Sequence, residues 1–99
     1  MSVQSFSAKQ PYEKYYVSFN FSRVIPSGVE ISSTAVTAVD AQGADATATI
    51  INNTLLTGDC KVHVCVKGGT VQIYKITCKI VCDNDEKYEL DGYLPVVEE

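Results

Sequence analysis

The sequence predicts an all-β fold, an immunoglobulin-like antiparallel β-sandwich of six or seven strands. Val and Ile together number 20, Leu and Met only 5, and 8 Thr add to the β-branched side chains, which favour strands over helices. Apolar and polar residues alternate along several segments, as expected for strands with one buried face. Turn-forming residues recur at short intervals, which is typical of the connections in a sandwich.

The first strand alternates aromatic and aliphatic residues with polar ones, and we expect Phe19 and Phe21 in the core. The turn Pro26-Ser27-Gly28 separates this strand from a second one at about 29–39. The apolar residues change parity within the second strand. A β-bulge near Ser33 would explain this change, because one extra residue reverses the two faces.

Four further strands follow along the chain, at about 45–51, 60–67, 70–82 and 86–97. We expect Gly68-Gly69 to form a hairpin turn into the longest of them. Asp83-Asn84-Asp85 is expected to form the next hairpin turn, because Asn and Asp tolerate positive φ. Residues 1–12 are polar and end near Pro11, so we predict a flexible N-terminal arm followed by the sandwich domain at 13–99.

Composition excludes several classes of function. The net charge is −4, which argues against a nucleic-acid-binding protein, since such proteins have a basic surface. The sequence contains no apolar run long enough for a membrane span. The first residues lack the charged and apolar regions of a signal peptide. We therefore expect neither nucleic acid nor membrane among the partners.

The four cysteines are expected to be structural. Cys60, Cys78 and Cys82 have inward parity, where a free thiol packs as a small apolar group, whereas Cys65 has outward parity. The same parity allows a disulfide from Cys60 to Cys78 or Cys82, although a chain without a signal peptide is expected in a reducing compartment. The spacing does not match a zinc site, and we expect no metal and no cofactor.

His63 and Cys65 share one outward face, and a Cys–His pair can provide a nucleophile and its base. Such a site also requires an orienting group, an oxyanion hole and a concave pocket. A flat strand surface provides none of these, so we expect no enzymatic activity and no catalytic residue. A small Cys-dependent enzyme remains as the less favoured alternative.

Four exposed apolar or aromatic residues are the candidates for contact with a partner: Tyr12, Tyr16, Val71 and Ile73. Exposed Tyr is enriched at protein interfaces, and an outward apolar row on a small domain indicates a partner or oligomerisation. The alternative is that the N-terminal arm of the same chain covers this row.

Several segments together resemble a family of small proteins of tailed bacteriophages and prophages, described as fiber–tail adaptor or virion accessory proteins. The resemblance covers residues 10–97 approximately and is carried by Tyr16–Arg23, Val24–Ile31, Gly58–Val62, Tyr74–Cys78 and Asp91–Val96. It implies a non-enzymatic structural protein, made in the bacterial cytoplasm and then assembled into the phage particle. Its partners would be other virion proteins, with a possible homo-oligomer.

Two other functions remain open, namely a head-decoration or head–tail joining protein, and an immunoglobulin-like module that binds carbohydrate or a cell surface. The segment beginning at Gly68-Gly69 is also similar to the start of an immunoglobulin F strand, in which a Tyr hydroxyl contacts nearby backbone. Tyr74 is the residue that we expect in this role.

Overall fold

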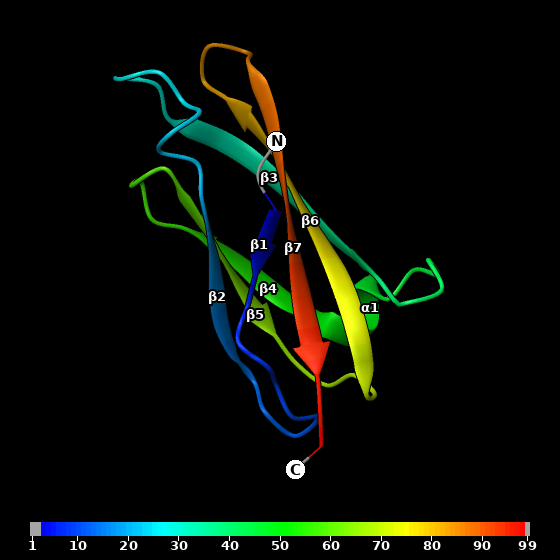
Figure 1. The fold of residues 1–99 in the computed structure, drawn as a ribbon. Helices are drawn as coiled ribbons and strands as arrows, with labels where there is room; N and C mark the ends of the chain where they lie inside the picture. Colours follow the sequence, from blue (N-terminus) through cyan, green and yellow to red (C-terminus); the bar gives the residue numbers. More distant parts are fainter. Residues whose placement is uncertain (1–2, 99) are drawn as a thin grey trace.

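Two β-sheets pack face to face in the structure, a computed structural model that describes residues 3–98 of the 99-residue chain (Figure 1). The four-stranded sheet has the order β1 (Val3–Ser5), β7 (Lys87–Val96), β6 (Gln72–Cys82), β3 (Ile31–Val39). The three-stranded sheet has the order β2 (Tyr15–Asn20), β5 (Lys61–Val66), β4 (Ile51–Leu56). The predicted all-β sandwich is therefore confirmed.

The strand order is that of an immunoglobulin-like domain. The second, fourth and fifth strands form one sheet, and the third, sixth and seventh form the other, as strands B, D, E and C, F, G do in that fold. Every pairing is antiparallel except that of β1 with β7, which is parallel. The N-terminal strand thus extends the sheet that contains the C-terminal strand.

The core lies between the sheets and consists of the inward-facing residues of each strand. Phe19 and Phe21 are fully buried, as predicted, and they pack with Val62, Ile76 and other aliphatic side chains from both sheets. The ring of Phe6 lies edge-to-face against Phe19, with 5.3 Å between ring centroids and an interplanar angle of 88°. Each such side chain contributes about 1.5–3 kcal/mol of burial free energy.

Three local predictions are confirmed. The pairing of β3 with β6 shifts register between Ile31 and Ser33, which is the expected bulge. β6 and β7 form the expected hairpin, with Asp85 at a φ of 70°. The buried hydroxyl of Tyr74 accepts a hydrogen bond from the backbone N–H of Thr70 at 3.0 Å, so this tyrosine ties the start of β6 to the preceding loop.

The strand predicted at 45–51 is wrong. Residues Thr47–Ile50 form one helical turn, α1, and the strand β4 comes after it at Ile51–Leu56. The buried side chains Ala46 and Ile50 are four residues apart, which is a helical spacing. The alternation of Ala and Thr in this segment suggested a strand instead. Asn52 and Asn53 lie within β4 although Asn disfavours strands, because pairing with β5 overrides local propensity.

The hairpin predicted at Gly68-Gly69 is also wrong. β5 and β6 belong to different sheets, so these glycines carry the chain from one sheet to the other. Gly69 has a φ of +95°, and a Cβ atom there would lie 2.9 Å from Cδ1 of Ile50. This crossing therefore requires glycine for both backbone conformation and space.

The N-terminal segment lies along the edge of β7 over its described residues. β1 pairs with residues Asp91 to Tyr93, and the backbone N–H groups of Phe6 and Lys9 donate to the carbonyls of Tyr93 and Pro95 at 2.9 Å. The flexibility predicted for residues 1–12 stays a prediction, and residues 1 and 2 of that arm lie outside the described part of the chain.

Lys9 fixes this segment, because its side chain is completely buried. Its Nζ donates to the carbonyls of Gly68 at 2.6 Å and Gln10 at 2.8 Å. Burial lowers the pKa of the Lys9 amino group, and the Glu13 carboxylate opposes that effect. The two carbonyls solvate the buried amine and join the arm to the loop between the sheets.

Candidate partner-binding surface

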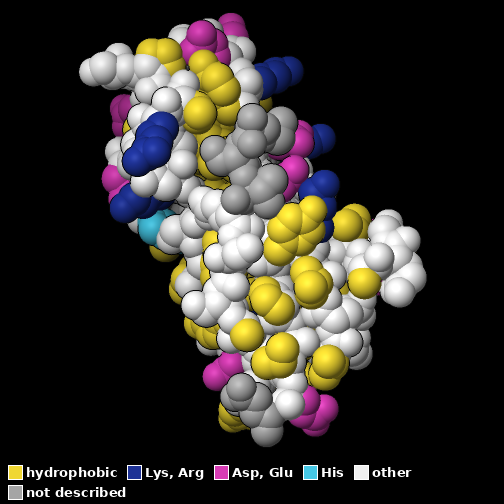
Figure 2. All heavy atoms as spheres, viewed as in Figure 1, with side chains coloured by type: hydrophobic (Ala, Val, Ile, Leu, Met, Phe, Trp, Pro, Cys, Tyr) yellow, Lys and Arg dark blue, Asp and Glu magenta, His cyan; other side chains and the backbone are white. Residues whose placement is uncertain are grey.

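Exposed hydrophobic side chains gather on the outer face of the four-stranded sheet, over the start of β6 and the end of β7 (Figure 2). Val71 is 59%, Ile73 54% and Tyr93 39% exposed, and Pro95 is half-buried opposite Ile73. These four residues are called the apolar patch below. The alternation of side chains along a strand explains why these residues are exposed. Tyr74 and Leu94 point into the core, so the residues next to them in the chain, Ile73, Tyr93 and Pro95, point outward.

The apolar patch brings together two of the four predicted contact residues, Val71 and Ile73. Tyr12 is 98% exposed in the turn before β2, at the same end of the molecule as the start of β6 (Figure 1). Tyr16 is half exposed and belongs to the other sheet. Tyr93 was missed as a candidate, although its parity opposite to Leu94 was the available signal.

The arm does not cover the apolar patch. β1 and the residues after it lie beside the edge of β7, and Ile73 and Val71 keep more than half of their surface exposed with the arm in place. The sequence left two explanations for these outward apolar residues, namely a binding partner or coverage by the N-terminal arm. The described part of the arm does not cover them, so the second explanation is excluded for that part. The patch is available to another molecule.

On the outer face of the three-stranded sheet, Cys65 lies under two neighbouring side chains. Tyr16 and Asn53 flank it on β2 and β4, and the Asn53 amide donates to the Tyr16 hydroxyl at 3.1 Å across β5. Only 4% of the Cys65 surface remains exposed. The outward parity predicted for Cys65 is correct, but the bridge above it keeps the thiol from solvent.

His63 belongs to a chain of hydrogen bonds rather than to a pair with Cys65. Thr57 donates its hydroxyl proton to Asp59, and this hydrogen bond lowers the pKa of the Asp59 carboxyl. Thr57 therefore accepts from Nε2 of His63 at 3.0 Å, and Nδ1 accepts from the Ser18 hydroxyl at 2.6 Å.

A hydroxyl bonded to an imidazole can act as a nucleophile with its base. Catalysis would also need oxyanion donors in a concave pocket, and none of these side chains lines the hollow beside Val24 and Tyr88 that is described below. The chain of bonds joins β2 to β5 and to the loop before it.

The other three cysteines are packed in or against the core. Cys78 and Cys82 are buried and Cys60 is partly buried, and all four thiols are free. Burial raises the pKa of the Cys78 thiol to about 11, and a hydrogen bond with Thr34 partly offsets this. Within residues 3–98, no group of three metal-ligating side chains comes together.

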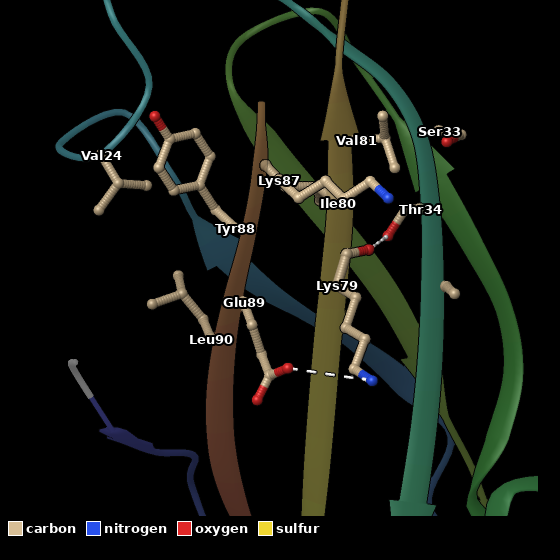
Figure 3. A pocket seen from close by; sticks show the side chains of 11 residues that line it. Val24, Ser33, Thr34, Lys79, Ile80, Val81, Lys87, Tyr88, Glu89 and Leu90 are labelled. Carbon is tan, nitrogen blue, oxygen red and sulfur yellow. Dashed lines mark hydrogen bonds and ion pairs between the residues drawn. The ribbon is translucent and has the colours of Figure 1, made fainter. Parts of the chain in front are cut away.

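A hollow of about 920 Å³ lies at the other end of the four-stranded sheet (Figure 3). Val24, Tyr88 and Leu90 line it beside β7. Lys79 and Glu89 also line it and form an ion pair at 4.0 Å from β6 to β7. Such an exposed pair contributes little to stability. The hollow and the apolar patch thus lie at opposite ends of one sheet.

Comparison with known families decides what kind of molecule carries these surfaces. The family described as podophage GP4 fiber-tail adaptor protein gp77 matches residues 9–95. The chain belongs to this family. The resemblance predicted from the residues is thus confirmed, and this member of the adaptor family is a structural protein of a phage tail. No curated protein was found to match it.

The family assignment agrees with the surfaces described above, since an adaptor acts by binding other virion proteins. In the described part of this adaptor, no helix has the length and apolar character needed to cross a bilayer.

Proposed function

We infer that this protein is a non-enzymatic adaptor between fiber and tail components, and that the apolar patch is its main contact with a neighbouring virion protein. Family membership supports the adaptor function. The observation that carries the choice of surface is the exposure of Val71, Ile73 and Tyr93 on one sheet face. Apolar and aromatic residues of this kind form the centre of protein interfaces.

The geometry supports a rigid contact. Ile73 lies opposite Pro95 on β7, and Lys75 lies opposite Tyr93, so the apolar patch spans two paired strands in the middle of a sheet. Side chains on paired strands lose less conformational freedom on binding than side chains on a loop, which favours affinity. Tyr12 extends from the turn at the same end of the molecule and supplies a further contact (Figure 1).

Tyr16 lies on the opposite sheet and forms a second, smaller contact in this proposal. Its hydroxyl is already held by Asn53, so its ring has a fixed orientation. An adaptor joins two partners, and two surfaces on opposite faces suit that task. The protein is made in the bacterial cytoplasm and enters the particle during assembly.

The test compares phage particles assembled with the variants Ile73→Asp and Ala48→Asp. Ala48 is exposed on α1, outside the four residues of the apolar patch, and is the matched control for adding one acidic side chain. A charge at the centre of an interface should lower incorporation about tenfold or more. Mass spectrometry of purified particles measures the ratio of this chain to the tail proteins.

Normal incorporation of Ile73→Asp, with Ala48→Asp also normal, would rule out the apolar patch as the contact. Absence of the wild-type chain from complete particles would rule out the adaptor function itself. Circular dichroism of both purified variants shows whether each is folded.

A further inference from the structure

The outer edge of β3 lacks the charged residues and prolines that normally prevent strand edges from pairing. No charged residue and no proline occurs between Ile31 and Val39. β3 is nine residues long, whereas β1 at the other edge of the same sheet has three. Long uncharged edges pair readily with another strand, and natural proteins usually block them with Lys, Pro or a bulge.

The two ends of β3 are blocked, which defines the part that is free. The bulge between Ile31 and Ser33 interrupts the start. Near the other end, the backbone N–H and carbonyl of Ala38 face away from β6, bonding to Thr47 Oγ1 at 3.0 Å and to the Ala46 N–H at 2.8 Å. The free stretch is therefore 33–37.

Strand alternation identifies the backbone groups that this free stretch presents. In an antiparallel ladder, alternate residues direct both backbone groups to the same side. Because Ala38 directs its groups away from β6, Val36 and Thr34 do so as well. Among residues 3–98 neither of them makes a backbone hydrogen bond outside the ladder with β6.

The neighbouring edge on the same side of the sandwich is uncharged too. β4 contacts β3, contains no charged residue, and exposes Leu55 and Leu56 by 49% and 40%. Two copies of this chain, each with a net charge of −4, repel one another through their acidic surfaces. The electrostatic repulsion between two copies is weakest when they meet through the side formed by β3 and β4, because these strands contain no charged residue.

We propose that β3 pairs antiparallel with β3 of a second copy of this chain, about a twofold axis at Ala35. In this register Thr34 lies opposite Val36 of the other copy, and the four outward backbone groups on each strand find partners. Ala35 meets its equivalent, and Ser33 meets Thr37, so small side chains face each other on the outer surface. The two four-stranded sheets become one continuous sheet.

Cysteine cross-linking tests the register. All variants carry Cys60→Ser, because Cys60 is the native thiol that is only partly buried. On mild oxidation Ala35→Cys should form a disulfide with its own copy. Thr37→Cys should not, since two copies of residue 37 are about 13 Å apart along the strands. Thr37→Cys mixed with Ser33→Cys should cross-link.

Sedimentation equilibrium tests the association itself. The wild-type chain should form a dimer, and Ala35→Lys should raise its dissociation constant about fivefold or more, because two ammonium groups meet at the axis. Ala8→Lys places the same charge on the exposed segment beside β7, at the opposite edge of the sheet, and should leave the constant unchanged. Circular dichroism verifies that both lysine variants remain folded.

A wild-type chain that is monomeric at every concentration, or a dimer with another cross-linking pattern, overturns the proposal. A monomer whose Ala35→Cys variant cross-links to a tail protein in particles would assign this edge to that protein instead. The apolar patch and the edge of β3 use different residues. Failure of one proposal therefore leaves the other intact.

Discussion

Gly92 in the middle of β7 is predicted to control whether the N-terminal segment stays in place. A Cβ atom at this position would lie 2.5 Å from Cε2 and 2.9 Å from Cζ of Phe6, and 3.2 Å from Cε1 of Phe19. Heavy atoms do not approach to 2.5 Å without bonding, so Gly92→Ala must displace the Phe6 ring. The core phenylalanine, Phe19, is fully buried and cannot move as easily.

The expected effect is a loss of about 1–3 kcal/mol in the free energy of unfolding, which is the range for overpacking a protein interior. Displacing Phe6 also breaks its edge-to-face contact with Phe19, worth about 0.5–1.5 kcal/mol. Because Phe6 and Lys9 donate to the carbonyls of Tyr93 and Pro95, their amide protons should exchange faster in the variant. Urea unfolding and hydrogen exchange by NMR measure the two effects.

The control is the same substitution in a Phe6→Ala background. Without the ring, Gly92→Ala should destabilise the protein much less, because only the 3.2 Å approach to Cε1 of Phe19 remains and Ala disfavours the unfolded chain relative to Gly. A coupling energy of about 1–3 kcal/mol between the two positions is expected for side chains in contact. Equal destabilisation in both backgrounds, or unchanged exchange at Phe6 and Lys9, would refute the reasoning.

Three further predictions concern buried polar and thiol groups. Lys9→Met should cost about 1–3 kcal/mol of stability, because the carbonyls that accept from Nζ lose a buried donor; urea unfolding should show it, and unchanged stability would contradict it. Folded Cys78 keeps its proton up to a pKa of about 11, whereas the unfolded thiol loses it above about 9, so stability should fall by up to about 2–3 kcal/mol as pH rises between these values. Cys78→Ala should lack this component of the pH dependence; an identical profile in the wild type and the variant would show that Cys78 does not cause it. Tyr16→Ala should expose Cys65 and speed its alkylation by iodoacetamide, whereas Tyr16→Phe, which keeps the ring, should change the rate less. Equal alkylation rates in all three proteins would mean that the ring does not shield the thiol.

The candidate surface was only partly predictable from the sequence. Alternation along β6 gave the outward direction of Ile73 correctly, because side-chain direction in a strand depends on parity alone. The neighbourhood of Tyr93 and Ile73 depends on the register of β7 against β6, which the sequence did not provide. Cys65 shows the same limit, since its parity was right but its burial depends on Tyr16 and Asn53 from two other strands.

The strands with strong local signals were determined by the sequence itself. The β-branched composition, the alternation around Phe19 and the Asp83–Asp85 turn are local properties, and they correctly gave a sandwich, a core and one hairpin. Only the tertiary structure decided that Gly68-Gly69 crosses between sheets, that β4 includes two asparagines, and that Lys9 is buried. Each of these depends on partners distant in the chain, and pairing with such partners outweighs the weak preference of a short segment.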